Sequence, residues 1–305
     1  MIAAVGDDYD GRVRAAAMAW LRQRCTPEDP VVRRGELLAF QFDGRPFPLV
    51  DNQLGIRKPR QMSAALSILT TFTSDRQRAP YDDALGPDML LRYKYEGTDP
   101  HRYTNVGLRR AYEAQVPLIW FVGVQQGLYV PVFPVWIVAD EPEQLQVAVA
   151  LDQDLRGLVR GGTISPIERS YAARISRQRL HQPVFRERVI QAYRTSCAMC
   201  LLRHRSLLDA AHIIPDREDR GIPAVSNGLA LCKIHHAAYD QNIIGVRPDL
   251  HVEVRTDILN EVDGPMLKHG LQEMNGRPLT LPRHGADHPN PGAIEERYER
   301  FRAAG

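Results

Sequence analysis

The sequence predicts an α+β protein with two domains. Its 305 residues are enough for two separate hydrophobic cores. Over residues 1–155, short strand-like runs separated by turn signals alternate with helical stretches, which favours a curved sheet or partly closed barrel with helices. Three of the four cysteines and a group of histidines lie between residues 197 and 240. We therefore expect a mixed N-terminal domain and a C-terminal domain organised around this cysteine–histidine cluster.

The N-terminal domain is expected to contain several short strands and two helices. Residues 11–24 have helical spacing and strong helix formers. Residues 36–51 read as two strands joined by a turn at Asp43-Gly44, which is a hairpin signal. Residues 105–115 predict a second helix. Further strands are expected over 87–97, over 116–140 with a turn near Gln126-Gly127, and over 145–151.

A basic helical linker, residues 156–185, is expected to separate the N-terminal domain from a C-terminal domain over 186–305. Gly161-Gly162 marks a break, and residues 165–196 are helical in pattern with Pro183 interrupting them. Many arginines lie between residues 156 and 205, and they suit either a polyanion or a solvated helix face. Beyond the cluster, residues 243–259 predict strands, and residues 290–305 predict a terminal helix with Pro291 near its start.

The overall composition is that of an ordinary soluble protein. The chain is 44% hydrophobic and 25% charged, with a formal net charge of +2. No apolar run approaches the roughly 20 residues that a membrane span needs. The first residues carry early aspartates and no basic start, so no secretory signal and a cytoplasmic location are expected. Disulfides are then not expected, and the isolated Cys25 reads as a packing residue.

The spacing of the cysteines predicts a structural zinc ion. Cys197 and Cys200 form one pair separated by two residues, and Cys232 and His235 form a second pair with the same spacing. Two such pairs supply four ligands for one tetrahedral Zn²⁺. The alternative is that the thiols are merely packed in a core.

The adjacent His236 is expected to serve a different ion. If residues 233–240 are a helix, neighbouring side chains point about 100° apart, so His235 and His236 face different directions. His236 and Asp240 are four residues apart and share a helix face. They are therefore candidates for a second metal site, and the alternative is a surface histidine with a helical aspartate partner.

The ordered residues His212, Asn227 and His236, on a strand, a loop and a helix, resemble the HNH nuclease family with its ββα-metal core. The resemblance covers residues 190–245 closely and extends more loosely upstream over residues 179–200, and this region is similar to a subgroup found in bacterial restriction proteins. It implies that His212 is the general base and that His236 and Asp240 hold a divalent cation, Mg²⁺ or Mn²⁺. It also implies that Asn227 orients the loop or reaches the metal.

One position departs from the pattern of this family. Many HNH nucleases carry a metal-ligating aspartate or histidine directly before the base, where this chain has Ala211. Asp209 stands three residues before His212. On a flat strand it points to the opposite face, so Asp209 is not expected to be a ligand.

The stretch from residue 79 to 124 resembles an SRA domain of the PUA superfold, which reads modified cytosine by flipping the base out. The resemblance places Tyr81, Asp83 and Tyr93 at the base-binding positions, where aromatic faces would stack and Asp83 would accept from a cytosine amine. The alternative is that the aromatic residues belong to the core of a sheet.

Together these features predict a modification-dependent endonuclease. It would recognise a modified base, with modified cytosine as the expected target, in double-stranded DNA. Because one HNH site cuts one strand, a homodimer is expected. Two alternatives stay open: a non-catalytic zinc-containing DNA-binding module, and an HNH nuclease whose N-terminal domain reads unmodified DNA or RNA.

Overall fold

The computed structural model describes residues 8–72, 86, 88–159, 165–218 and 220–304. These residues fall into two compact units that meet in sequence between Val184 and Phe185. Within the described ranges, no helix is both long and apolar enough to cross a membrane.

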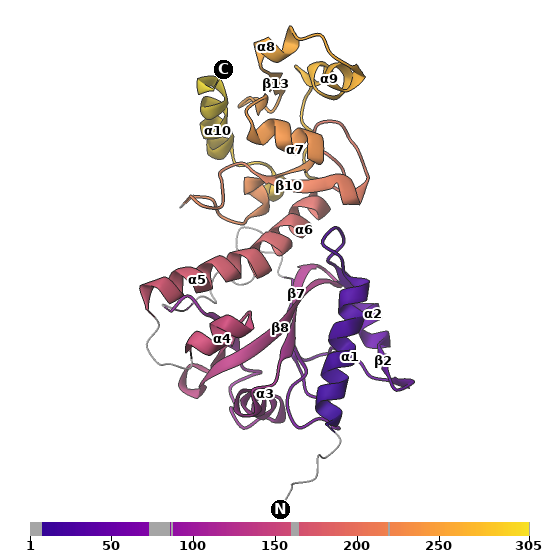
Figure 1. The fold of residues 1–305 in the computed structure, drawn as a ribbon, viewed down its shortest axis with the longest axis vertical. Helices are drawn as coiled ribbons and strands as arrows, with labels where there is room; N and C mark the ends of the chain where they lie inside the picture. The colour runs from indigo at the N-terminus through magenta and orange to yellow at the C-terminus, as the bar shows by residue number, and fades with distance from the viewer. Residues whose placement is uncertain (1–7, 73–85, 87, 160–164, 219, 305) are drawn as a thin grey trace, which may run out of the picture. The chain divides into compact units, whose positions relative to one another are not determined.

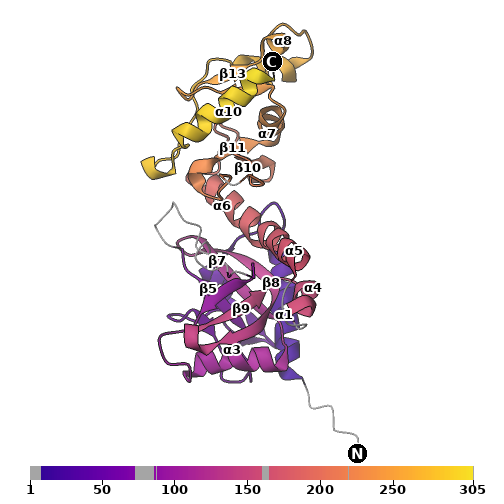
Figure 2. The same ribbon diagram turned by 90° about the vertical axis from the view of Figure 1, so that its left-hand side faces the viewer.

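A curled, mixed sheet of seven strands forms the centre of the first unit (Figure 2). The strand order is β4-β5-β7-β8-β9-β6, with β1 paired to β8. The β5–β7 pair is parallel and the other pairs are antiparallel, in agreement with the predicted curved sheet. The strands are β1 (Val32–Arg33), β4 (Ile56–Arg57), β5 (Ser67–Thr70), β6 (Leu91–Lys94), β7 (Leu118–Gln125), β8 (Leu128–Glu141) and β9 (Gln146–Ala150).

Helices cover this sheet because its central strand is apolar on both faces. All residues of β7 except Gln125 are buried. Helix α1 (Tyr9–Arg24) contributes Val13, Ala17 and Leu21, spaced four residues apart, to the core. Helix α3 (Tyr103–Ala114) also packs against β8, and α4 (Gln153–Val159) follows the last strand (Figure 1).

The predicted hairpin at residues 36–51 is partly correct. The turn lies at Asp43-Gly44, where both residues have positive φ, and it joins β2 (Gln41–Phe42) to β3 (Arg45–Pro46). The expected first strand is wrong at its start, since α2 (Arg34–Ala39) is a helix. Glu36 accepts from the backbone N–H of Arg33 and so caps the first turn of that helix.

A helical segment runs from residue 166 to 192. It consists of α5 (Pro166–Ser176), a π-helical turn η3 (Arg177–His181) and α6 (Gln182–Ala192). The predicted interruption at Pro183 is therefore wrong. Proline lacks the N–H that an α-helix would use at this position. The wider π-turn directly before it, where the Gln182 N–H bonds to the Arg177 carbonyl, lets the chain stay helical.

Besides most of α6, the second unit contains two antiparallel strand pairs and four further α-helices within its described residues. Strands β10 (Leu208–His212) and β11 (Gly228–Cys232) form one antiparallel pair, and β12 (Ile244–Val246) and β13 (Val252–Val254) form the other. Helix α7 (Lys233–Asp240) follows β11 and packs across β10 (Figure 1). The remaining helices are α8 (Thr256–Leu259), α9 (Pro265–Gly270) and α10 (Pro291–Ala303).

In the second unit, the predicted terminal helix is confirmed, and the predicted end of the preceding strands is wrong. The terminal helix begins at Pro291 as expected, and the Asn290 side chain accepts from the Ala293 N–H at 3.0 Å to cap it. The strand predicted to continue to residue 259 ends at Val254, because residues 256–259 turn into α8.

Candidate active site and metal centre

Strands β10 and β11 and helix α7 bring the predicted site residues together. His212 ends β10 and pairs in register with Gly228 at the start of β11. Cys232 ends β11 and is the N-cap of α7, which carries both adjacent histidines. Two strands followed by a helix are the elements that the resemblance to HNH nucleases implied.

The predicted zinc ligands converge on one point. The Sγ atoms of Cys197, Cys200 and Cys232 and a ring nitrogen of His235 lie within 4.8 Å of one another. Among the described residues, this is the one group of three or more such side chains that converges in this way. The His235 Nδ1 lies 3.4 Å from Cys197 Sγ and 3.3 Å from Cys232 Sγ. Three thiolates and an imidazole are a donor set that fits tetrahedral zinc.

The outer nitrogen of His235 is also engaged. His235 Nε2 lies 2.8 Å from the carbonyl oxygen of Gly270, at the end of α9. With the proton on Nε2, that nitrogen donates to the carbonyl, and Nδ1 keeps its lone pair for an ion. This contact ties α9 to the metal centre.

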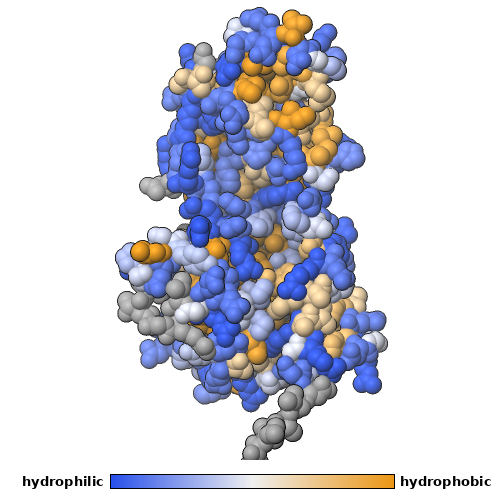
Figure 3. All heavy atoms as spheres, in the orientation of Figure 1, coloured by the Kyte–Doolittle hydropathy of each residue, from blue (hydrophilic) through white to orange (hydrophobic). Residues whose placement is uncertain are grey.

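Apolar side chains cover the metal centre. A cavity of about 300 Å³ is lined by Cys200 and His235 together with Leu201, Ile234 and Met266. These three apolar side chains are exposed, and hydrophobic surface gathers over α7 and α9 in Figure 3. An apolar shell of this kind limits the access of water to a metal site.

Asn227 holds the loop that follows β10. Its side chain is buried, and Oδ1 accepts from the Ile214 N–H at 2.9 Å. Nδ2 donates to the carbonyls of Ile214 and Ile222, each at 3.0 Å. The Asn227 carbonyl accepts from the Ile213 N–H at 2.9 Å, one residue after His212. Of the two roles that the sequence left open, this geometry matches the one in which Asn227 orients the loop.

The imidazole of His212 lies stacked on the ring of Phe185 from α6. The two ring centroids are 4.0 Å apart and the rings are inclined by 16°. Burial lowers the pKa of His212 below its usual value, and the nearby carboxylates of Asp216 and Asp240 only partly oppose this effect. A neutral imidazole at neutral pH is the form that accepts a proton from water, so the chemistry of a general base is available here.

His236 and Asp240 are neighbours, as predicted. His236 Nε2 lies 3.3 Å from Asp240 Oδ2. Two adjacent ligands on an octahedral ion with bonds near 2.1 Å lie about 3.0 Å apart, so these two atoms fit one divalent cation. Their donor set of one imidazole and one carboxylate suits such an ion.

Asp209 lies beside this site, although strand alternation places it on the face of β10 opposite His212, and that it is not a metal ligand stays a prediction. Its Oδ2 lies 3.7 Å from His236 Nδ1, on the opposite side of the ring from Asp240. The Asp209 carboxylate is the largest of the influences that raise the pKa of His236, and His236 in turn lowers the pKa of Asp209. The alternation of an ideal strand separates Asp209 from His212, but it says nothing of His236, which comes from α7 packed across β10.

The sequence analysis did not identify the two residues of α6 that contact the site. Phe185 supports His212, and the next residue, Arg186, donates from Nε to Asp209 Oδ1 at 3.2 Å. A Cβ at Gly228 would lie 2.8 Å from Phe185 Cζ, so glycine at this position permits the close packing of α6. Two signals lay in the sequence: Arg186, which we assigned to the basic stretch, and the looser upstream part of the resemblance to HNH nucleases, which covers residues 179–200.

Several arginines of that basic stretch have partners inside the protein. Arg179 donates to the carbonyl oxygens of Phe133 and Leu151 in the first unit. Arg186 and Arg205 both pair with Glu187, whose side chain is fully buried. These arginines stabilise the fold, and the polyanion interpretation therefore loses part of its support.

The structure describes one of the three predicted base-binding residues. Tyr81 and Asp83 lie outside the described residues. The Tyr93 hydroxyl lies 2.9 Å from the carbonyl oxygen of Gly55 and 3.0 Å from that of Leu69. Its ring meets Trp120 edge-on, with centroids 6.0 Å apart. The Tyr93 hydroxyl therefore links β6 to β5 and to the residue that precedes β4. Its role in binding a base stays a prediction.

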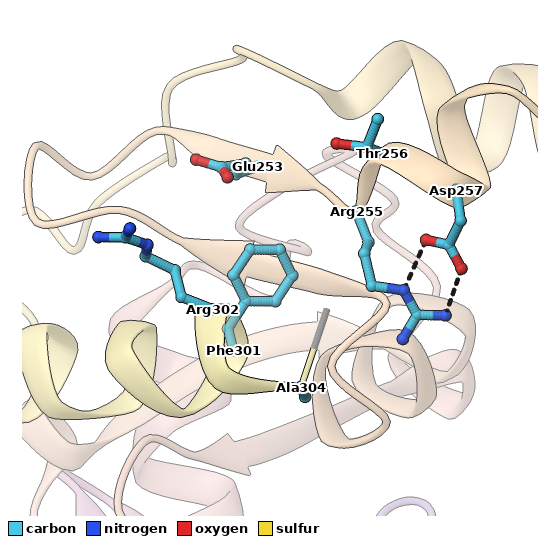
Figure 4. A pocket seen from close by; sticks show the side chains of 7 residues that line it. All are labelled: Glu253, Arg255, Thr256, Asp257, Phe301, Arg302 and Ala304. Atoms are coloured by element: carbon cyan, nitrogen blue, oxygen red, sulfur yellow. Dashed lines mark hydrogen bonds and ion pairs between the residues drawn. The ribbon is translucent and has the colours of Figure 1, made fainter.

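A separate pocket of about 530 Å³ lies between β13, α8 and the end of α10 (Figure 4). Arg255 and Asp257 form a bidentate ion pair at its edge, with N–O distances of 2.6 and 2.8 Å. None of the predicted site residues lines this pocket. The candidate site is instead the surface formed by β10, β11 and α7.

The match to a family model agrees with this arrangement. Residues 197–247 match the family model described as HNH endonuclease. Among solved structures, a modification-dependent TagI restriction endonuclease is similar at 16% identity, with a TM-score of 0.29 over 81% of this chain and 85% of that one. No curated protein matches the sequence significantly. The family model spans both zinc pairs, His212, Asn227, His236 and Asp240. Residues 197–247 therefore form an HNH endonuclease domain.

Proposed function

We propose that this endonuclease is modification-dependent: the first unit recognises a modified base in double-stranded DNA, and the HNH domain hydrolyses the phosphodiester bond. The observation that carries the catalytic part is the convergence of His212, His236 and Asp240 on one side of the β10–β11 hairpin and α7. The recognition part is supported by the curled sheet of a separate unit and by the resemblance to SRA domains.

In the proposed reaction, His212 takes a proton from the attacking water. Burial keeps the imidazole neutral, Phe185 fixes the plane of its ring, and Asn227 fixes the backbone that follows it. His236 and Asp240 would hold Mg²⁺ or Mn²⁺, which supplies charge stabilisation for the phosphate and the departing oxygen. The four ligands around Cys197 would hold Zn²⁺ in a structural role.

The first unit would take the modified base, with modified cytosine as the proposed target. Tyr81, Asp83 and Tyr93 are the residues proposed to contact it. The tight hydrogen bonding of the Tyr93 hydroxyl means that this residue would offer only its ring. Cutting both strands would require two active sites, so we propose that the protein acts on DNA as a homodimer.

The proposal is tested by cleavage of matched duplexes with Mg²⁺ or Mn²⁺. The set contains unmodified, 5-methylcytosine, 5-hydroxymethylcytosine, glucosylated hydroxymethylcytosine and N6-methyladenine DNA, and His212→Ala is the control for contaminating nucleases. Cutting of modified cytosine duplexes alone is the expected result. Equal cutting of all duplexes would refute the modified-base reader. Binding of DNA without cutting under any condition would favour the non-catalytic module.

A further inference from the structure

Asp209 of β10 contacts the candidate metal ligand His236, and this contact suggests a role for Asp209 in the site. The carboxylate lies at Nδ1 of His236, at 3.7 Å, and the Asp240 carboxylate lies at Nε2, at 3.3 Å. The two nitrogens of an imidazole point in opposite directions along the ring. His236 is therefore held between two carboxylates, one at each nitrogen.

The two carboxylates are not equivalent. The side chain of Asp240 is 57% exposed and that of Asp209 is 30% exposed. Oδ1 of Asp209 accepts from Arg186 Nε at 3.2 Å, and Oδ2 lies 3.5 Å from Lys233 Nζ. Asp209 is thus already surrounded by two cations, whereas Asp240 reaches outward. A divalent ion beside Arg186 and Lys233 would meet repulsion, so Asp240 is the better metal ligand of the two.

Arg186 itself is fixed in place. Its Nη2 donates to the Leu208 carbonyl at 2.7 Å, and its Nη1 lies 2.6 Å from the buried Glu187 carboxylate. Glu187 also pairs with Arg205. Arg186 of α6 thus holds the Asp209 carboxylate through hydrogen bonds to two consecutive residues of β10, Leu208 and Asp209.

A metal-binding histidine commonly donates its other N–H to a carboxylate, which fixes both the tautomer and the direction of the ring. We propose that Asp209 is the positioning residue of His236: it holds the proton on Nδ1 and thereby turns the Nε2 lone pair towards the divalent ion shared with Asp240. This inference rests on the proposed metal role of His236. It also accounts for Ala211, since the chain retains an acidic side chain on β10 but uses it behind the ligand.

The test measures metal affinity and histidine tautomer in the full chain loaded with zinc. Mn²⁺ binding is followed by isothermal titration calorimetry, and the imidazole ¹⁵N shifts of histidine-labelled protein report the tautomer before Mn²⁺ is added. The His236 signals are assigned with His236→Gln. Asp209→Ala should weaken Mn²⁺ binding about 10-fold or more and release His236 into a mixture of tautomers. Asp209→Asn keeps an acceptor at the same place and should retain the tautomer and most of the affinity.

The matched control is Asp249→Asn. Asp249 also pairs with an arginine and a histidine of the second unit, Arg247 and His251, but lies outside the site. It should leave Mn²⁺ affinity unchanged. Unaltered Mn²⁺ affinity in Asp209→Ala, or a His236 that keeps its proton on Nδ1 in that variant, would overturn the inference. Neither readout needs DNA cleavage. A wild-type protein that binds Mn²⁺ through His236 but cuts no duplex would refute the nuclease proposal and leave this inference standing.

Discussion

Replacing Asn227 with alanine separates a loop-holding role from a metal-binding role. The buried amide makes three hydrogen bonds to the backbone of Ile214 and Ile222. Each contributes about 1 kcal/mol net, so Asn227→Ala should destabilise the second unit by about 3 kcal/mol. Because alanine keeps none of the three, the loop after His212 should also open more often.

The assay must follow the second unit directly. All three tryptophans lie at or before residue 136, so tryptophan fluorescence reports on the first unit. Hydrogen exchange of peptides covering residues 213–228 is the better probe. A loss of 3 kcal/mol corresponds to protection lower by a factor on the order of 100. The cleavage rate should fall with it, while Mn²⁺ affinity stays near the wild-type value.

Asn275→Ala is the matched control, because its exposed side chain makes one backbone contact, to the Val254 N–H at 3.0 Å. It should cost about 1 kcal/mol and leave the protection of residues 213–228 unchanged. If Asn227→Ala kept full protection of the loop but lost Mn²⁺ affinity, the reasoning from these hydrogen bonds would be refuted and Asn227 would reach the ion.

Three further predictions follow from the site. Cys200→Ser should lose the bound zinc and unfold the second unit, since a structural zinc contributes on the order of 10 kcal/mol; metal analysis and calorimetry check this, with Cys25→Ser in the first unit as the control. His212→Ala should lower the single-turnover cleavage rate by a factor of about 10² to 10⁴ while DNA binding and thermal stability persist; a cleaving variant would remove His212 as the base. Because burial lowers the pKa of His212, its neutral form should persist as the pH falls, and at saturating Mn²⁺ the rate should reach half of its plateau only below about pH 6.5. A single-turnover rate that already declines above about pH 7 would contradict this assignment.

The local parts of the site could be predicted from the sequence. The doubled spacing at Cys197 and Cys232 requires only that each pair form a short turn, and the separation of His235 from His236 follows from helical geometry. The terminal helix was likewise marked by its own first residues, Asn290 and Pro291. In each case the information lies within a few neighbouring positions.

The contacts made by α6 could not be predicted in this way. Phe185 lies 27 positions before His212, and no periodicity within either segment states that their rings stack. The contact of Asp209 with His236 could not be predicted either, because strand alternation describes the faces of β10 alone and His236 comes from α7, which packs across that strand. Both contacts join separate elements, and the one between Phe185 and His212 also requires glycine at position 228.

The way α6 supports the histidines has a practical bearing on making a portable cutting module from this chain. The matched family region begins at Cys197, yet the ring plane of His212 and the carboxylate beside His236 depend on Phe185 and Arg186. A fragment that starts at the first zinc cysteine would retain every ligand and the general base but lose both supports. A transferable nuclease should therefore begin no later than Gln182, the first residue of α6.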